Sequence, residues 1–360
     1  MVYQVIGIMS GSSLDGLDIA FVKLEENRGV WHYEFQAFAC VAYQNEMAEQ
    51  LKNASKLTVP DFLKLNTRFG HYIGEQVNLF IEQNKLQHQV HLITSHGHTV
   101  FHSPLHNTST QIGDGATIAA VTELPTITDL RSMDVALGGQ GAPIVPIGDK
   151  LLFPEYDYWL NIGGIANITA RVNDSFVAFD VCPANQVLNL LAQNTGKEMD
   201  ENGALAADGN LLIDVLSQLN EQDYYRQLPP KSLSNEAAIA LAFPHLLESA
   251  HDVKDLLHTT VVHIAEQIAQ ATKHFPSNSV NPKMLVTGGG AFNTYLVKQI
   301  TNLLSLQNIE VVVPDAQTVN YKEALVMALI GTLRWREEPN VLKEITGASR
   351  CSISGALWMN

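Results

Sequence analysis

A glycine- and serine-rich turn joins two apolar runs near the start of the chain, and a similar turn occurs near its middle. The first apolar pair spans residues 6–22 with its turn at Gly11–Asp18, and the second spans residues 158–170 with its turn at Gly163–Gly164. Apolar runs on both sides of a short turn predict a β-hairpin in each place. Because the motif occurs twice, we expect two related α/β lobes.

The elements expected around each hairpin follow one order. In the first half, strands are expected at 2–9, 17–24, 31–43, 90–94 and 125–131, with helices at 45–54 and 60–84. In the second half, strands are expected at 158–162, 165–170, 175–180, 284–286 and 310–313, with helices at 185–195, 205–219, 235–246, 254–274 and 321–336. A further helix is expected with the glycine triplet 288–290 at its N-terminus and its end at residue 304. We therefore expect a first lobe of residues 1–132, rejoined by 340–360, and a second lobe of 133–339. The glycine-rich stretch 137–146 is interpreted as the crossing between them.

Composition limits the functions that this chain can have. At 360 residues it exceeds the size at which a single core usually stops growing, which also favours two lobes. Its net charge of −15 argues against a nucleic-acid partner, because such binding depends on Lys and Arg. It has neither a visible signal peptide nor an apolar run of the ~18 residues that a membrane span needs. Three widely spaced cysteines fit a reduced compartment, so we expect a cytoplasmic protein that binds neither membranes nor nucleic acid.

The first turn combines groups that bind anions with groups that bind cations. Its glycines and hydroxyls can present neutral donors to a phosphate, whereas its two carboxylates would repel one unless a divalent cation lay between. The stretch therefore indicates metal-assisted phosphoryl chemistry, although an ordinary polar hairpin is an equally simple interpretation. The candidate residues are Gly11, Ser12, Ser13, Leu14, Asp15, Gly16, Leu17 and Asp18.

A histidine-rich turn follows the strand expected at 90–94. Polar side chains at the carboxyl end of a strand are typical ligand contacts in α/β folds, so His96, Gly97, His98 and Thr99 are candidate substrate residues. His96 and His98 would share one strand face, but with His102 they match no familiar zinc spacing, and polar substrate contacts are favoured.

An acid and a base end the strand expected at 125–131. Asp129 could accept hydrogen bonds from sugar hydroxyls, and the Arg131 guanidinium could bind a carboxylate or amide. Pairing of Asp129 with Arg131 is an equally good interpretation.

Four motifs together resemble those of the anhydro-N-acetylmuramic acid kinase family, in the acetate and sugar kinase/Hsp70/actin superfamily. The motifs are the turn at 9–18, Asp129-Leu130-Arg131 with the glycine-rich 138–143, the second hairpin at 161–167, and Thr287-Gly288-Gly289-Gly290. The resemblance covers essentially the whole chain. It implies a two-lobed actin-like/ribonuclease H-like ATPase fold, with duplicated mixed β-sheets flanked by helices and a cleft between the lobes.

The resemblance also implies a reaction. The enzyme would use ATP and Mg²⁺ to open the anhydro bridge of 1,6-anhydro-N-acetylmuramic acid with water and to phosphorylate O6, giving N-acetylmuramic acid 6-phosphate in peptidoglycan recycling. A homodimer is what the family suggests.

The resemblance assigns roles to residues of this sequence. Asp180 would be the catalytic base, and Glu323 an acid near the sugar and the attacking water. A plain charge at a helix N-terminus is an alternative interpretation of Glu323. The implied nucleotide contacts, beyond the first turn, are Asn161, Gly163, Gly164 and Asn167 for phosphate and Gly288, Gly289, Gly290 and Asn293 for adenosine.

The chain departs from the family pattern in one segment. Asp180-Val181-Cys182-Pro183-Ala184-Asn185 stands where the family usually has Asp-Thr-Gly-Pro-Gly-Asn. A small buried thiol is favoured for Cys182 over a nucleophile. Two rival functions stay open, namely another small-molecule kinase of the superfamily and a nucleotide-driven binding module.

Overall fold

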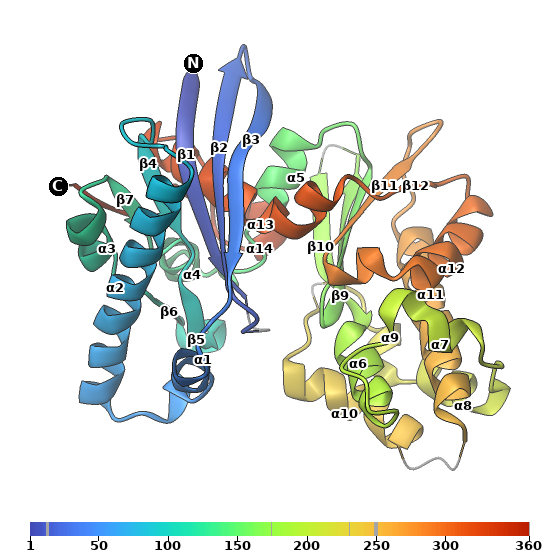
Figure 1. The fold of residues 1–360 in the computed structure, drawn as a ribbon. Coiled ribbons are helices and arrows are strands. Elements are labelled where there is room, and N and C mark those ends of the chain that lie inside the picture. The colour runs from blue at the N-terminus through green and yellow to red at the C-terminus, as the bar shows by residue number, and fades with distance from the viewer. Residues whose placement is uncertain (12–13, 174, 230, 248–250, 360) are drawn as a thin grey trace. The chain divides into compact units, whose positions relative to one another are not determined.

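The computed structural model describes residues 1–11, 14–173, 175–229, 231–247 and 251–359, which form two compact units (Figure 1). Unit 1 comprises Met1–Phe153 and Tyr321–Asn360, and unit 2 comprises Pro154–Asn320. These boundaries differ from those expected at 132/133 and 339/340. Unit 1 extends further because α5 (Pro146–Leu152) packs on β3 (Val30–Val41) and most of α13 (Ala316–Trp335) packs on the first sheet.

The glycine-rich stretch 137–146 lies inside unit 1, so its interpretation as the crossing between lobes is wrong. Its backbone is tied to neighbours of the same unit: the Gly141 N–H donates to Asp134 Oδ2 at 2.8 Å, and the Gln140 N–H donates to the Thr346 carbonyl at 2.8 Å. These bonds satisfy backbone groups that lie in no regular element.

The main sheet of unit 1 has the strand order β13-β7-β4-β1-β2-β3. Strands β1, β2 and β3 form the expected antiparallel meander, β4 and β7 extend it in parallel, and β13 closes the edge antiparallel to β7. A separate hairpin, β5–β6, follows β4. The strands not yet bounded are β1 (Val2–Ser10), β2 (Leu17–Asn27), β4 (Leu92–Ser95), β5 (His98–Ser103), β6 (Thr108–Ile112), β7 (Thr126–Thr128) and β13 (Ala356–Trp358).

Helices cover both faces of this sheet. On one face, α2 (Val59–Gln83) buries Phe69 and Ile73 against Ile6 and Ile8 of β1, as the apolar periodicity of residues 60–84 predicts. On the other face, α13 approaches so closely that a Cβ on Gly7 would lie 1.9 Å from the Ala324 carbonyl oxygen. The other helices and 3₁₀ turns are α1 (Asn45–Lys52), η1 (Ala54–Lys56), η2 (Pro104–His106), α3 (Gly115–Thr122), α4 (Ser132–Ala136) and α14 (Lys343–Thr346).

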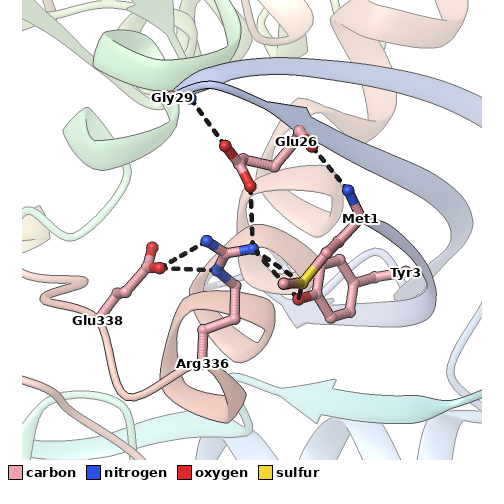
Figure 2. Close-up of polar contacts among 6 residues, drawn as sticks. All are labelled: Met1, Tyr3, Glu26, Gly29, Arg336 and Glu338. Carbon is pink, nitrogen blue, oxygen red and sulfur yellow. Dashed lines mark hydrogen bonds and ion pairs between the residues drawn. The ribbon is translucent and has the colours of Figure 1, made fainter.

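An ionic cluster fixes the last turn of α13 to the strand ends farthest from the Gly11–Asp18 turn. Figure 2 shows Arg336 between two carboxylates: its Nη1 lies 3.2 Å from Glu26 and its Nη2 lies 2.6 Å from Glu338. The same guanidinium donates to the Tyr3 hydroxyl at 3.2 Å and lies over the Trp31 ring at 5.4 Å. The C-terminal end of α13 is therefore fixed by Arg336, and its middle by the close contact with Gly7.

The sheet of unit 2 repeats the order of the first five strands of unit 1. Its order is β10-β9-β8-β11-β12, with β8, β9 and β10 antiparallel in sequence and β11 and β12 parallel to β8. The duplication expected from the sequence is thus present strand by strand. The bounds are β8 (Tyr158–Ile162), β9 (Ile165–Val172), β10 (Ser175–Pro183), β11 (Lys283–Thr287) and β12 (Glu310–Val312).

The helices of unit 2 bury one continuous core against this sheet. One of them differs from expectation: residues 205–219 do not form a single helix. The chain turns at Gly209, where a Cβ would lie 2.1 Å from the Lys254 carbonyl oxygen, and the Asn210 N–H donates to Asp255. This contact with α11 ends one helix before the next begins. The elements are α6 (Asn185–Gln193), η3 (Glu201–Gly203), α7 (Ala204–Ala207), α8 (Ile213–Asn220), α9 (Asp223–Arg226), α10 (Asn235–Leu247), α11 (Val253–His274), η4 (Gly289–Phe292) and α12 (Thr294–Ser305).

Candidate functional site

The β1–β2 turn of unit 1 holds the two acids that the sequence singles out. Ser12 and Ser13 lie outside the described residues; Leu14 is half-buried with φ +58°, and its N–H lies 3.4 Å from the Gly11 carbonyl. Asp15 is exposed, whereas Asp18 is half-buried on β2 opposite Cys40 of β3. Burial, with repulsion from nearby carboxylates, raises the pKa of Asp18 to about 6.

Cys40 lines this turn from β3. It lies directly opposite Asp18 of β2, and a Cβ on Gly16 would lie 2.7 Å from its Sγ. Partial burial and the neighbouring carboxylate raise the pKa of Cys40 to about 12, so it is a weakly reactive thiol. Gly16 is thus required by close packing.

Glu323 joins the acids of the turn from α13. The sequence places it at a helix start, but α13 begins at Ala316, so its interpretation as a helix N-terminal charge is wrong. The close approach of Gly7 to Ala324 sets the neighbouring Glu323 near Asp15 and Asp18. Burial is the main cause of its raised pKa; the charges of Lys322 and Arg131 oppose the shift.

A second group of side chains connects the turn to the histidine-rich segment. The Tyr43 hydroxyl donates to Ser10 Oγ at 2.7 Å, and Ser10 Oγ lies 3.3 Å from His98 Nδ1. Burial lowers the pKa of His98 to about 4, so this imidazole stays neutral at pH 7. The Ser10 hydroxyl can therefore accept from Tyr43 while it donates to His98. Sequence reasoning missed Tyr43, since nothing in the sequence connects position 43 with position 98.

His96 and Arg131 contact each other across the carboxyl ends of β4 and β7. Arg131 Nε donates to His96 Nε2 at 2.9 Å, and its Nη1 donates to the Gly141 carbonyl at 2.9 Å. His96 Nδ1 lies 2.8 Å from the Gly97 carbonyl, which requires the proton on Nδ1 and leaves Nε2 to accept. Burial, followed by the charge of Arg131, lowers the pKa of His96 to about 3. Arg131 is thus held by a neutral histidine and a carbonyl, instead of pairing with Asp129.

His96 and His98 do not share a strand face, contrary to expectation. Strand β4 ends at Ser95 and β5 begins at His98, because Gly97 turns the chain with φ +72°. A Cβ on Gly97 would lie 2.4 Å from the Ile112 carbonyl oxygen, so this turn packs directly on β6. Thr99, one residue into β5, is exposed and accepts a hydrogen bond from Gln111 at 3.3 Å.

A small cavity of about 140 Å³ lies beside this turn within unit 1. Its lining includes Ser95, His96, Thr128, Asp129 and Trp358. Asp129 follows β7 directly, is exposed, has φ +57° and accepts a hydrogen bond from Ser132. Asp129 and His96 therefore border one polar recess.

Unit 2 brings its candidate residues together in one row across three strands. Asn161 of β8 lies opposite Asn167 of β9, and Asn167 lies opposite Asp180 of β10. Side chains of residues directly opposite one another in a sheet share a face. The two amides and the carboxylate therefore stand side by side next to the turn at Gly163–Gly164.

The hairpin turn of unit 2 is held by the start of α6. The Asn185 N–H donates to the Gly163 carbonyl at 3.1 Å, and the Ala184 N–H donates to the Gly164 carbonyl at 2.8 Å. A Cβ on Gly163 would meet only the Ile165 carbonyl oxygen, at 3.5 Å, and one on Gly164 only Gln186, at 3.6 Å. Space for a ligand thus lies beside both glycines.

The glycine triplet packs on this hairpin. Gly288 has φ +81°, and a Cβ there would lie 2.3 Å from Asn161 Oδ1; one on Gly290 would lie 2.2 Å from the Ile162 side chain. A Cβ on Gly289 would meet only Asn185, at 3.6 Å. Gly288 and Gly290 are therefore required by close packing, and Gly289 leaves room above the backbone.

Asn293 has a structural role that the sequence did not reveal. The expected helix does not begin at the triplet: the 3₁₀ turn η4 intervenes, and Asn293 caps α12 by accepting from the Leu296 N–H at 2.9 Å. A Cβ on Gly203 would lie 2.4 Å from Asn293 Oδ1, so η3 packs against this cap.

The segment after Asp180 accommodates its departures from the family pattern. Cys182 is fully buried, and burial raises its thiol pKa, as expected for an inert packing residue. Ala184, where the family usually has glycine, has φ −135° and ψ −108°, outside the α and β regions that residues other than glycine usually adopt. Asn185 keeps a contact with the hairpin by donating to the Ile162 carbonyl at 3.1 Å.

Metal-binding clusters and membrane-spanning helices are both absent from the residues that the structure describes. These residues contain no group of three or more His, Cys, Asp or Glu side chains arranged to hold a metal ion. Each helix within these residues is also too short or too polar to cross a membrane.

The strand order and the hairpin turns define the class of this protein. Two sheets of order 3-2-1-4-5, each with a glycine turn between its first two strands, make it an actin-like ATPase fold of the ribonuclease H type. A profile of the family described as anhydro-N-acetylmuramic acid kinase matches residues 3–360. The chain belongs to this family.

Relatives carry the same description. An anhydro-N-acetylmuramic acid kinase of Vibrio parahaemolyticus is 32% identical over 364 residues, covering 98% of this chain and 97% of the relative. Another, of Francisella tularensis subsp. novicida, is 30% identical over 375 residues, again covering 98% and 97%.

Solved structures of other families are more distant. A 2-hydroxyglutaryl-CoA dehydratase component of Acidaminococcus fermentans aligns with a TM-score of 0.49 at 13% identity, covering 91% of this chain and 96% of that one. A ROK family glucokinase of Streptomyces griseus, in complex with glucose and AMPPNP, aligns with a TM-score of 0.43 at 11% identity, covering 91% and 98%. The fold class follows from the strand order and not from these alignments.

Proposed function

We propose that this protein uses ATP and water to convert 1,6-anhydro-N-acetylmuramic acid into N-acetylmuramic acid 6-phosphate, a step of peptidoglycan recycling. The family match over residues 3–360 carries the proposal. In the balanced reaction, water oxygen bonds to C1, the C1–O6 bond breaks, and O6 takes the γ-phosphoryl group as ADP leaves.

Asp180 is the proposed general base. Its carboxylate removes a proton from the attacking water as the anhydro bridge opens, and general base catalysis typically contributes about 10²–10⁴-fold. Burial raises the pKa of Asp180, which strengthens it as a base while the Leu233 N–H keeps the carboxylate form accessible. Glu323 is the proposed second acid, near the sugar and the attacking water.

The sugar contacts are proposed on unit 1. Arg131 carries the positive charge that suits the lactyl carboxylate, and its hold on neutral His96 keeps that charge from being cancelled. Gly97, His98, Thr99 and Asp129 are the proposed contacts for hydroxyl and amide groups. These contacts distinguish the proposed substrate from those of other kinases in the superfamily.

The nucleotide contacts are proposed on both units. Gly11–Asp18 would hold phosphate from unit 1; Asn161, Gly163, Gly164 and Asn167 would hold it from unit 2, and Gly288–Asn293 the adenosine. The open space beside Gly163, Gly164 and Gly289 supports this assignment, since a ligand can approach the backbone there.

A magnesium ion fits the acids of the first turn. The charges of Asp15 and Glu323 raise the pKa of Asp18, and the charge of Asp15 raises the pKa of Glu323; a divalent cation would relieve this repulsion. Bound Mg²⁺·ATP supplies the phosphoryl group and neutralises the charge that develops on it. Asp15 and Asp18 would hold the ion together with phosphate oxygens and water.

Three further properties complete the proposal. The protein acts in the cytoplasm, forms a homodimer, and binds neither membranes nor nucleic acid. The net charge of −15 supports the last point. Analytical ultracentrifugation tests the dimer: a single species near the 39.5 kDa of one chain at micromolar concentration would overturn it.

The deciding experiment follows the oxygen of water. The protein is incubated with ATP, Mg²⁺ and the anhydro sugar in ¹⁸O-labelled water, and the product is examined by mass spectrometry. A phosphorylated sugar with one ¹⁸O at C1 is expected, and Asp180→Asn should abolish it while nucleotide still binds. Failure of the wild-type protein to phosphorylate the sugar, with ATP left intact, would overturn the assignment.

A further inference from the structure

Asp180 lies at a distorted position on the edge of the unit 2 sheet. β10 is the edge strand, and its register against β9 shifts between Asp180 and Cys182. Such a bulge re-aims a side chain but weakens the ladder that fixes it. Something outside the sheet must therefore hold the backbone and carboxylate of Asp180.

Three hydrogen bonds from one segment do this. The Tyr224 hydroxyl donates to the Asp180 carbonyl at 2.6 Å, and the Asp180 N–H donates to the Lys231 carbonyl at 3.3 Å. The Leu233 N–H donates to Asp180 Oδ2 at 2.8 Å. Backbone N–H, backbone C=O and carboxylate of one residue are thus all bound by residues 44 to 53 positions later in the chain.

Lys231 also binds Tyr224, so two of the residues that hold Asp180 contact each other. Its Nζ donates to the Tyr224 carbonyl at 3.1 Å and lies 4.5 Å from the centre of the Tyr224 ring. This contact joins Tyr224, which donates to the Asp180 carbonyl, to Lys231, whose own carbonyl accepts from the Asp180 N–H. An ammonium over an aromatic face is favourable in a partly desolvated site.

We propose that Tyr224, Lys231 and Leu233 form a positioning strap that aims the Asp180 carboxylate at the attacking water. The strap acts through its hydrogen bonds to Asp180, so its members are positioning residues. The inference rests on the proposed function, because the strap affects catalysis only if Asp180 is the general base.

The charged and titratable groups around Asp180 are few among the described residues. They are Tyr224, Cys182 and Lys231, and burial raises the pKa values of the first two and lowers that of Lys231. Tyr224 and Cys182 are therefore neutral near pH 7. The Leu233 N–H favours the carboxylate form of Asp180, so loosening the strap should raise the pKa of the base.

The test compares two adjacent tyrosines. Tyr224→Phe removes the hydroxyl that binds the Asp180 carbonyl, whereas Tyr225→Phe removes one that lies 3.0 Å from His263 Nε2. Tyr224→Phe should lower kcat on the order of 10- to 100-fold, as a small misplacement of a catalytic group does, and move the acid limb of the kcat–pH profile to higher pH. Tyr225→Phe should leave that limb where the wild type has it. The nucleotide Kd should be unchanged in both.

Lys231 supplies a second, independent pair of variants. Lys231→Met should repeat the effect of Tyr224→Phe, and Lys231→Arg should restore part of the lost rate, since its guanidinium can still donate to the Tyr224 carbonyl. This pair decides the matter if Tyr224→Phe unfolds below the assay temperature.

Failure of the strap proposal and failure of the proposed function would give different results. If the wild type phosphorylates the sugar but Tyr224→Phe and Lys231→Met keep its kcat and acid limb, the strap is overturned and the proposed function stands. If the wild type forms no phosphorylated sugar, the proposed function is overturned and the strap with it.

Discussion

Replacing Gly7 by alanine should loosen the contact that sets Glu323 beside the first turn. A Cβ at Gly7 would lie 1.9 Å from the Ala324 carbonyl oxygen and 2.8 Å from the Ala328 N, both backbone atoms of α13. No side chain can rotate away, so the helix itself must move. Overpacking typically costs about 1–3 kcal/mol, and a clash with helix backbone belongs at the upper end of that range, whereas the smaller entropy of the unfolded alanine chain returns about 0.4–1 kcal/mol.

The net loss of about 2 kcal/mol is measurable by calorimetry of the ligand-free protein. For a unit of roughly 200 residues it lowers Tm by about 4–8 °C. Gly163→Ala is the matched control, because its Cβ would meet only the Ile165 carbonyl oxygen, at 3.5 Å. It should keep or slightly raise Tm while weakening nucleotide binding. A Gly7→Ala protein whose Tm lies within about 1 °C of the wild type would refute the reasoning from close packing.

Two further predictions concern charge. Asp18→Asn should raise Tm at pH 7 and leave it near the wild-type value at pH 4. The pKa of Asp18 in the folded protein, about 6, exceeds the ordinary value of 3.8. The stability that the protonated carboxyl contributes is therefore fully present below pH 3.8 and is lost as the pH rises through 6. Equal Tm differences at both pH values would contradict this. Arg336→Met should lower Tm more than Lys64→Met, because the Arg336–Glu26 pair is largely buried and the Lys64–Asp61 pair is exposed; thermal scans at low and high salt compare them.

Local patterns predicted most of the elements correctly. The hairpins and the long amphipathic helices α2 and α11 lie where periodicity places them, because each buries an apolar face that the sequence displays. The break near Gly209 could not be predicted, since its cause is the Lys254 carbonyl, 45 positions away in the chain. The apolar periodicity of residues 205–219 continues through Gly209, although the backbone there turns to pack against α11.

The candidate site was predictable as a set of residues but not as a set of contacts. Asp129 and Arg131 look like a pair in the sequence, yet Arg131 binds His96, which directly follows β4. Glu323 looks like a helix start, because the polar side chains of Gln317, Thr318 and Asn320 make the first turn of α13 resemble a loop. His96 reaches Arg131, and Glu323 reaches the acids of the first turn, because segments far apart in the sequence pack together. Local sequence patterns do not show such contacts.

The duplication explains why the two units carry different chemistry at one position. In unit 1 the row across the hairpin is Met9, Asp18 and Cys40; in unit 2 it is Asn161, Asn167 and Asp180. The carboxylate stands on the second strand in one unit and on the third strand in the other. On the second strand it lies beside the turn, where a cation bound to phosphate would reach it. On the third strand the neutral amides of Asn167 and Asn161 separate it from the parallel strand β11, so this row carries one carboxylate beside two uncharged side chains.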